Sequence, residues 1–157
     1  MDPGSGTKSD AWKLDLSAVA IPKDPLSGRM HGRRFVCDLA EVSPSATPRF
    51  LTLQQGEGAQ GDLKITLIIP DRNGLEGRTI NLPTAAAIPA EGDYRVSILY
   101  QENGEYHSQQ FTRNQAGFVL RLECEQRSRK RIKGRIYLCL GDDQKSYVAG
   151  SFEAKLR

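Results

Sequence analysis

The amino-acid sequence predicts an all-β protein: an antiparallel β-sandwich of about eight to ten strands, immunoglobulin-like or jelly-roll-like, with a closed β-barrel as the second choice. Three observations lead to this prediction. Short segments alternate apolar and polar residues, which is the side-chain period of a strand with one buried face. Gly, Pro, Asn and Asp close these segments at short intervals. No segment has both the apolar period and the length of a convincing helix.

Length and composition indicate one folded domain. The chain has 157 residues, of which 26% are charged and 38% hydrophobic, as is typical of a globular protein with a core. We expect residues 1–11 to be a flexible leader or a linker added for expression, and residues 12–157 to be the single domain. No apolar run is long enough to span a membrane, and no secretory signal is evident at the amino terminus. The compartment and the oligomeric state are left open.

The first half of the chain contains five segments that are expected to be strands. In chain order they are residues 12–16, 31–39 (which begin as a Gly-marked turn), 50–54, 63–69 and 79–82. The β-branched content of residues 63–69 suits a central strand. Between Pro83 and Pro89 there is room for no more than one helical turn.

The strongest local prediction is a hairpin whose turn contains Asn103 and Gly104. Asn-Gly tolerates the positive φ angles of a type I′ turn, which matches the twist of paired strands. The expected strands are residues 94–100 and 106–111, and their register places Val96 opposite Phe111 and Tyr100 opposite His107.

Three more strands are expected after this hairpin, at residues 118–125, 135–140 and 148–156. Their parity also sorts the cysteines. Cys37 and Cys124 share the inward parity of their apolar neighbours, so we expect them to act as small apolar residues, with a disulfide between them as the less favoured alternative. Cys139 has the opposite parity to Leu138 and is expected to face outward. Three cysteines placed in this way do not indicate a disulfide framework.

The order and spacing of three pieces of the sequence carry a resemblance. They are Gly28–Phe35, a turn that leads into an early strand; Leu51–Leu53, followed after a loop by Leu63–Ile69; and Gly134–Leu140 with Val148–Ala154, the closing hairpin. Over about four-fifths of its length, the chain resembles small bacterial β-sandwich modules of unassigned function. This resemblance implies a compact module attached to larger proteins, and it implies no catalytic residue.

The clearest functional signal is a basic run at the expected tip of a hairpin. Six of the nine residues from 127 to 135 are cationic: Arg127, Arg129, Lys130, Arg131, Lys133 and Arg135. Such a run holds a positive potential that binds phosphates, sulfates or an acidic protein surface. The alternative is a solvated loop whose charges prevent edge-to-edge pairing of strands, because the run contains no aromatic residue that would stack on bases.

A second basic patch is formed by Arg29, His31, Arg33 and Arg34. It would join the first patch if the two loops lay at the same end of the molecule. The expected role of His31 is to hydrogen-bond to local backbone, and that of His107 is to pack across the strands against Tyr100.

Aromatic residues suggest a second kind of binding face. Tyr137 and Tyr147 have outward parity on neighbouring strands, and with Trp12 they would form an exposed strip for sugar rings or a partner surface. The alternative is a covered cross-strand aromatic pair.

Metal sites and catalysis find little support in the sequence. Two distant histidines and three scattered cysteines match no zinc spacing. Asp71, Asn73 and Glu76 offer oxygen ligands as a calcium loop does, but the same residues are typical of a turn. We expect no enzyme and no cofactor, because no nucleophile motif or phosphate-binding loop is present. A hydrolase is the alternative, because the fold can bring a catalytic pair of carboxylates together without any signature in the sequence.

We therefore expect a non-catalytic binding or structural module that acts in a larger protein or assembly, with a protein or a glycan as its partner. One alternative is a polyanion-binding module that uses residues 127–135. The other is a carbohydrate-binding module that uses exposed tyrosines.

Overall fold

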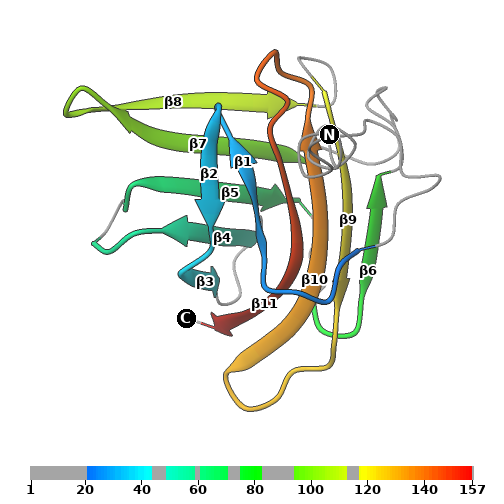
Figure 1. The fold of residues 1–157 in the computed structure, drawn as a ribbon. Helices are drawn as coiled ribbons and strands as arrows, with labels where there is room; N and C mark the ends of the chain where they lie inside the picture. Colours follow the sequence, from blue (N-terminus) through cyan, green and yellow to red (C-terminus); the bar gives the residue numbers. More distant parts are fainter. Residues whose placement is uncertain are drawn as a thin grey trace, which may run out of the picture.

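A computed structural model of the protein describes residues 21–43, 49–58, 61–70, 75–82, 94–112 and 117–156. These residues form eleven strands and no helix, which confirms the all-β prediction. The strands are hydrogen-bonded into one sheet, and this sheet curls into an open half-barrel (Figure 1).

The strands are, in chain order, β1 (Ser27–Met30), β2 (Arg33–Val36), β3 (Leu39–Val42), β4 (Arg49–Gln55), β5 (Leu63–Ile69), β6 (Thr79–Leu82), β7 (Arg95–Glu102), β8 (Glu105–Thr112), β9 (Phe118–Cys124), β10 (Arg131–Leu140) and β11 (Tyr147–Leu156). Their order in the sheet is β6-β9-β10-β11-β3-β4-β5-β7-β8. All pairs are antiparallel except β11 with β3, which meet in parallel over two residue pairs, Lys155 with Glu41 and Leu156 with Val42.

The short β11–β3 junction divides the sheet into two groups of strands. One group is β6, β9, β10 and β11, and the other is β3, β4, β5, β7 and β8. The β1–β2 hairpin lies between the two groups (Figure 1). β1 pairs with β11, while the amide of Val36 in β2 donates a 2.9 Å hydrogen bond to the Gln55 side chain in β4. The hairpin therefore connects both groups.

The apolar core fills the inside of the curled sheet. In β5 the buried residues Leu63, Ile65, Leu67 and Ile69 alternate with half-buried ones, as the period of a strand predicts. Aromatic side chains from three strands, Phe35, Phe111 and Phe118, are fully buried in the same cluster. Residues of both groups belong to this one buried cluster, and the curl of the sheet removes its inner apolar face from water.

The β7–β8 hairpin has the predicted turn and register. Asn103 and Gly104 have φ angles of 55° and 80°, which confirms the expected positive values. Val96 pairs with Phe111, and Tyr100 pairs with His107.

Two glycines allow β1 to lie close against β11. A Cβ atom on Gly28 would lie 2.1 Å from the backbone oxygen of Tyr147. Gly150 has a φ of +139°, and a Cβ there would lie 2.7 Å from the backbone oxygen of Asp24. Gly28 thus lets β1 lie close to β11, and Gly150 does the same for the segment just before β1, because neither position carries a side chain.

Two strand predictions need correction. The segment 31–39 is not one strand: β2 ends at Val36 and β3 begins at Leu39, after the amide of Asp38 has bonded to the oxygen of Gln54. β10 begins at Arg131 rather than at residue 135, because its pairing with β11 extends to Lys155. The expected strand at residues 12–16 and the helical turn at 84–88 lie outside the described residues.

Candidate anion-binding end of the sheet

The basic run forms a tight turn and the first part of β10. The amide of Ser128 donates to the oxygen of Arg131, and the amide of Arg131 donates to the oxygen of Ser128, both at 3.0 Å. Arg129, between them, has a φ of 57°. Arg127 Nε donates a 2.7 Å hydrogen bond to the oxygen of Arg129, so the loop is organised by its own backbone and one guanidinium.

Strand alternation places three cations on the outer face of β10. Ile132 and Ile136 are buried in the core, and the side chains of Arg131, Lys133 and Arg135 have the opposite parity. Residues two apart on one face of a strand are separated by about 7 Å. The result is a row of cations that continues the basic turn along the sheet.

Two of the six cations are held in ion pairs. Arg131 Nη1 lies 3.3 Å from Glu153 Oε2 on β11. Arg135 Nη2 lies 2.8 Å from Glu123 Oε1 on β9, and the other oxygen of that carboxylate lies 3.0 Å from Arg121 Nε. The Glu123 side chain is half-buried and the other side chains in these pairs are more exposed, so the pairs orient the guanidinium groups more than they stabilise the fold.

The other four cations make no ion pair within the part of the chain that the structure describes. They are Arg127, Arg129, Lys130 and Lys133, and all four are exposed. Exposed cationic side chains of this kind are accessible to an anionic ligand.

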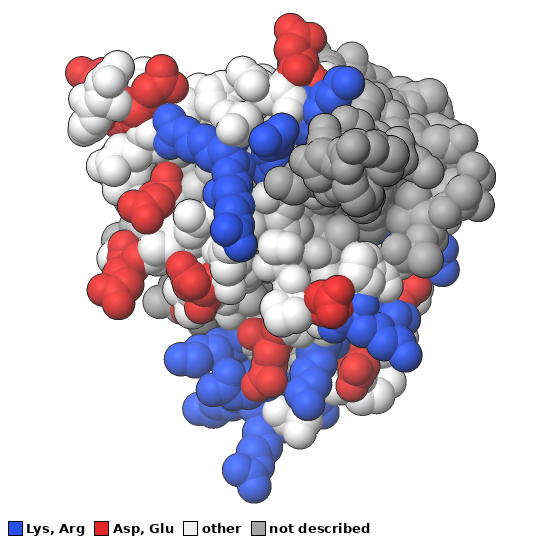
Figure 2. All heavy atoms as spheres, in the orientation of Figure 1, with Lys and Arg blue, Asp and Glu red and all other residues white. Residues whose placement is uncertain are grey.

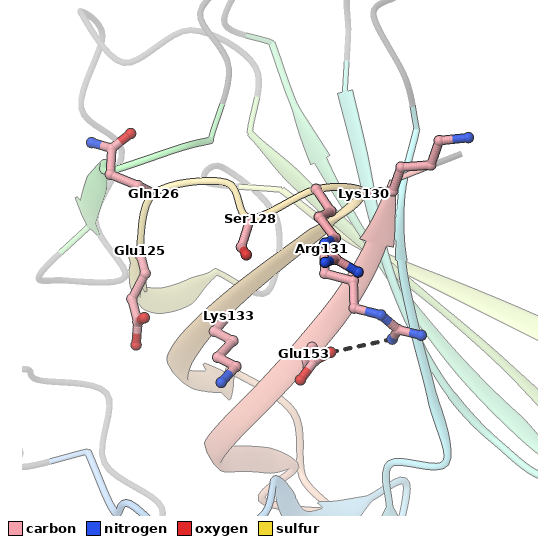
Figure 3. A pocket seen from close by; sticks show the side chains of 8 residues that line it. Glu125, Gln126, Ser128, Lys130, Arg131, Lys133 and Glu153 are labelled. Atoms are coloured by element: carbon pink, nitrogen blue, oxygen red, sulfur yellow. Dashed lines mark ion pairs between the residues drawn. The ribbon is translucent and has the colours of Figure 1, made fainter.

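A hollow of about 790 Å³ lies beside this turn (Figure 3). Four cations and two carboxylates line it, together with two polar residues: Arg129, Lys130, Arg131, Lys133, Glu125, Glu153, Gln126 and Ser128. A second hollow of about 640 Å³ shares Glu125, Lys133 and Glu153 with the first and adds Lys23 and Arg135. In the space-filling view, Lys and Arg gather at this lower end of the molecule with a few carboxylates among them (Figure 2).

The lining determines which chemistry is available at this end. No aromatic ring lines the first hollow, so a ligand there is held by charge and not by stacking. Guanidinium and ammonium groups at such spacing suit the oxygens of phosphate or sulfate esters. The carboxylates of Glu125 and Glu153 are acceptors that repel an anion, so they limit where one is seated.

The two basic patches do not join. Arg29 pairs with Tyr147 at the beginning of β11, whereas Arg131 pairs with Lys155 near its end. Lys155 lies eight positions after Tyr147 along the strand, which corresponds to about 26 Å. In Figure 1 the β1–β2 turn and the β9–β10 loop lie at opposite ends of the molecule.

His31 has a different role from the one expected. Its ring stacks on the ring of Tyr100, with centroids 4.0 Å apart, and its Nδ1 atom is buried and has no hydrogen-bond partner among the described residues. Tyr100 also faces His107 at 5.7 Å and has the guanidinium of Arg33 5.5 Å from its ring centroid, which confirms the expected Tyr100–His107 packing. Arg33 donates to the oxygen of Gln101, so this patch holds two hairpins together.

The expected strip of exposed tyrosines is wrong. Tyr137 is only 4% exposed and Cys139 is fully buried, although both have the outward parity. They form a second small core with Val119, against which Ile21, Tyr147 and Ala149 pack. The thiol of Cys139 donates a 3.0 Å hydrogen bond to the Tyr137 hydroxyl. Parity identified the correct face, but Tyr137 is buried on that face and Tyr147 is half-buried, so the ring of Tyr137 is not accessible to a sugar.

The remaining predicted site residues fall partly outside the described chain. Trp12, Asp71 and Asn73 are among the residues that the structure does not describe, and Glu76 is half-buried at the start of a turn. Within the described ranges, no three His, Cys, Asp or Glu side chains are grouped so as to hold a metal ion.

All three cysteines are free thiols. Cys37 and Cys124 pack against the main core, as expected for small apolar residues. Burial raises the pKa of the Cys37 thiol. Burial also raises the pKa of Cys124 to about 12, and the nearby Arg78 offsets only part of that rise.

Sequence reasoning did not identify the acidic members of the site. Glu153, Glu123 and Glu125 come from β11, β9 and the loop that follows β9, and they face the basic run through the register of β10. Outward parity on a strand that neighbours the basic run was the only available signal. This signal identifies Glu153 only once the strand register, which places Glu153 opposite Lys133, is known.

Comparison of the chain with protein-family models, with curated proteins and with solved structures finds no match. The resemblance to small bacterial modules therefore stays a prediction. In the described part of the chain there is no helix with the length and apolar character needed to cross a membrane.

Proposed function

We propose that this protein is a non-catalytic binding module of the β-sandwich type, and that its basic end holds a linear polyanion through phosphate or sulfate groups. One observation carries the proposal. Four cations line the hollow beside the β9–β10 turn, and three of them, Arg129, Lys130 and Lys133, form no ion pair with any described residue. Uncompensated charge gathered around a concave surface is the arrangement that anions seek.

The shape of the site favours a chain-like ligand over a small anion. Its cations, all exposed except the half-buried Arg135, spread from the turn along β10 to Arg135 and across to Lys23, over two adjoining hollows. A single phosphate is held best by several donors that converge in a buried pocket, whereas a polyanion meets separate surface charges with successive groups. Binding then depends on the release of counterions and falls steeply with salt.

The scaffold supports the same proposal. Residues of both groups of strands belong to one apolar cluster, and the basic turn extends from one end of that scaffold. A rigid sheet that presents charges at fixed intervals loses little conformational freedom on binding.

The test is equilibrium binding of a fluorescent heparin octasaccharide to the protein over a series of salt concentrations. In the variant Lys130→Gln/Lys133→Gln, two exposed cations of the site are removed. We expect weaker binding, and a plot of log K against log salt whose slope is shallower by about one to two, close to one for each lost contact. Unchanged binding in this variant would contradict the proposal.

A matched control removes the same charge from the opposite end. The variant Arg29→Gln/Arg34→Gln loses two exposed cations of the other basic patch. We expect its slope and affinity to stay near those of the original protein. Equal losses in the two variants would mean that net charge, and not this site, governs binding. A single-stranded DNA oligonucleotide of similar charge, run in parallel, distinguishes phosphate from sulfate as the preferred group.

A further inference from the structure

β8 lies at one edge of the curled sheet. It is the last strand in the sheet order, and within the described residues it pairs only with β7. Eight consecutive residue pairs join the two strands from Arg95–Thr112 to Glu102–Glu105 without a bulge. The side chains from Glu105 to Ser108 and that of Gln110 are exposed. The edge is therefore long, regular and accessible.

Edge strands of soluble proteins usually carry features that prevent further pairing, such as lysine, proline, a bulge or a very short strand. β8 has none of these between Tyr106 and Thr112, where its sequence is Tyr-His-Ser-Gln-Gln-Phe-Thr. Its single acidic residue, Glu105, lies beside the turn. The opposite edge, β6, is only four residues long, so it conforms to the usual pattern.

We propose that the β8 edge pairs antiparallel with β8 of a second copy of this chain, which joins two half-barrels into one continuous sheet. A strand that meets its own copy about a twofold axis satisfies the open backbone groups of both partners at once. Because residues 106–112 contain no Asp, Glu, Lys or Arg, this pairing brings no like charges together. A charged edge would be suited to a partner of opposite charge instead.

The side chains near the centre of β8 suit such a pair. With Gln109 on the twofold axis, Ser108 of one copy lies opposite Gln110 of the other, and both are exposed in the single chain. Hydroxyl and amide groups facing each other across strands can exchange hydrogen bonds. A dimer built on one strand pair without an apolar interface is weak, so it forms at high protein concentration.

The test is sedimentation equilibrium of the protein from about 10 µM to about 1 mM. We expect the apparent mass to rise from 17.4 kDa toward twice that value as concentration increases. In the variant Ser108→Lys/Gln110→Lys, lysines of the two copies face each other, and we expect the mass to stay at that of the monomer. A mass that never rises, or a dimer that withstands these lysines, overturns the proposal.

Two controls separate the edge from general effects. The variant Glu57→Gln/Asp143→Asn makes the same change in net charge at two exposed positions off the β8 edge, and we expect it to dimerise like the original protein. The thermal unfolding midpoint of each variant shows whether the fold is intact. Amide hydrogen exchange of residues 105–111 should slow as concentration rises, and unchanged exchange there in a dimeric sample places the contact elsewhere and overturns the proposal.

Discussion

The imidazole ring of His31 stacks on the ring of Tyr100, with their centroids 4.0 Å apart and their planes inclined by 23°. This contact joins the tip of the β1–β2 hairpin to β7 and extends the core toward one end of the sheet. The backbone amide of His31 also donates a 2.9 Å hydrogen bond to the Ser146 hydroxyl, in the turn between β10 and β11. One residue thus connects the hairpin to both groups of strands.

Removal of the central ring should loosen this connection. We expect Tyr100→Ala to lower the free energy of unfolding by about 2 kcal/mol, because the stack with His31 and the contact with Arg33 are both lost. The control His107→Ala removes only the exposed ring at 5.7 Å and should cost less than about 1 kcal/mol. Urea unfolding followed by circular dichroism measures both, and equal costs would show that the His31 stack contributes nothing.

Gly28 should be far less tolerant of substitution than Gly104. A Cβ on Gly28 would lie 2.1 Å from backbone, whereas nothing lies within 4 Å of a Cβ on Gly104, which only has to keep its φ of +80°. We expect Gly104→Ala to cost about 1 kcal/mol and Gly28→Ala more than about 3 kcal/mol. The measurement is the urea midpoint of each variant. If Gly28→Ala does not fold, it will show no cooperative unfolding transition while Gly104→Ala shows a normal one, and this result also supports the prediction. Similar midpoints for the two variants would refute the close approach of β1 and β11.

The buried thiol of Cys124 should make stability fall in alkaline solution. Burial raises its pKa from the ordinary 9.0 to about 12, so the folded state holds this proton more tightly than the unfolded state. The contribution is fully present below pH 9 and is lost as pH rises through the folded-state value. At pH 10 the loss should be about 1.4 kcal/mol relative to pH 8, by the conversion of one pKa unit.

The variant Cys124→Ala isolates this effect from the other groups that titrate above pH 9. We expect the drop in unfolding free energy between pH 8 and pH 10 to be smaller in the variant by that amount. Identical pH dependence in the two proteins would mean that the thiol is accessible to water in the folded state.

Glu153 should weaken polyanion binding, because its carboxylate pairs with Arg131 at 3.3 Å and lines the hollow. We expect Glu153→Gln to tighten heparin binding by roughly fivefold at low salt, which corresponds to about 1 kcal/mol for one removed charge at contact distance. The matched control is Glu102→Gln, which breaks the 3.7 Å pair with Arg33 at the other end. Fluorescence titration compares them, and an equal gain in both variants would argue against a local effect.

Local pattern predicted the elements that short-range physics determines. The Asn103-Gly104 turn sets the β7–β8 register, so the pairing of Val96 with Phe111 followed from the sequence. The burial of Tyr137 did not follow from the sequence. It depends on residues distant in the sequence, such as Ile21, that pack against it, and the parity of a strand gives no information about such contacts. The separation of the two basic patches likewise required the pairing of β1 with β11.

The candidate site was predicted only in part for the same reason. The basic run can be read directly from the sequence. The ion pairs of Arg131 and Arg135 cannot, because their partners Glu153 and Glu123 lie on neighbouring strands. Register alone does not determine which cation is paired. Lys133 lies opposite Glu153, but the Glu153 carboxylate pairs with Arg131, whereas Arg135 pairs with Glu123, the residue opposite it.

The central claim is that the end of the sheet around the β9–β10 turn is where a polyanion binds. Titration of ¹⁵N-labelled protein with unlabelled heparin octasaccharide, followed by amide chemical shifts, tests it most directly. We expect the largest shifts at residues 125–133 and at Glu153 and Lys155, and small shifts at residues 29–34. Shifts that are largest at residues 29–34, or that are spread evenly over both ends, would contradict the account.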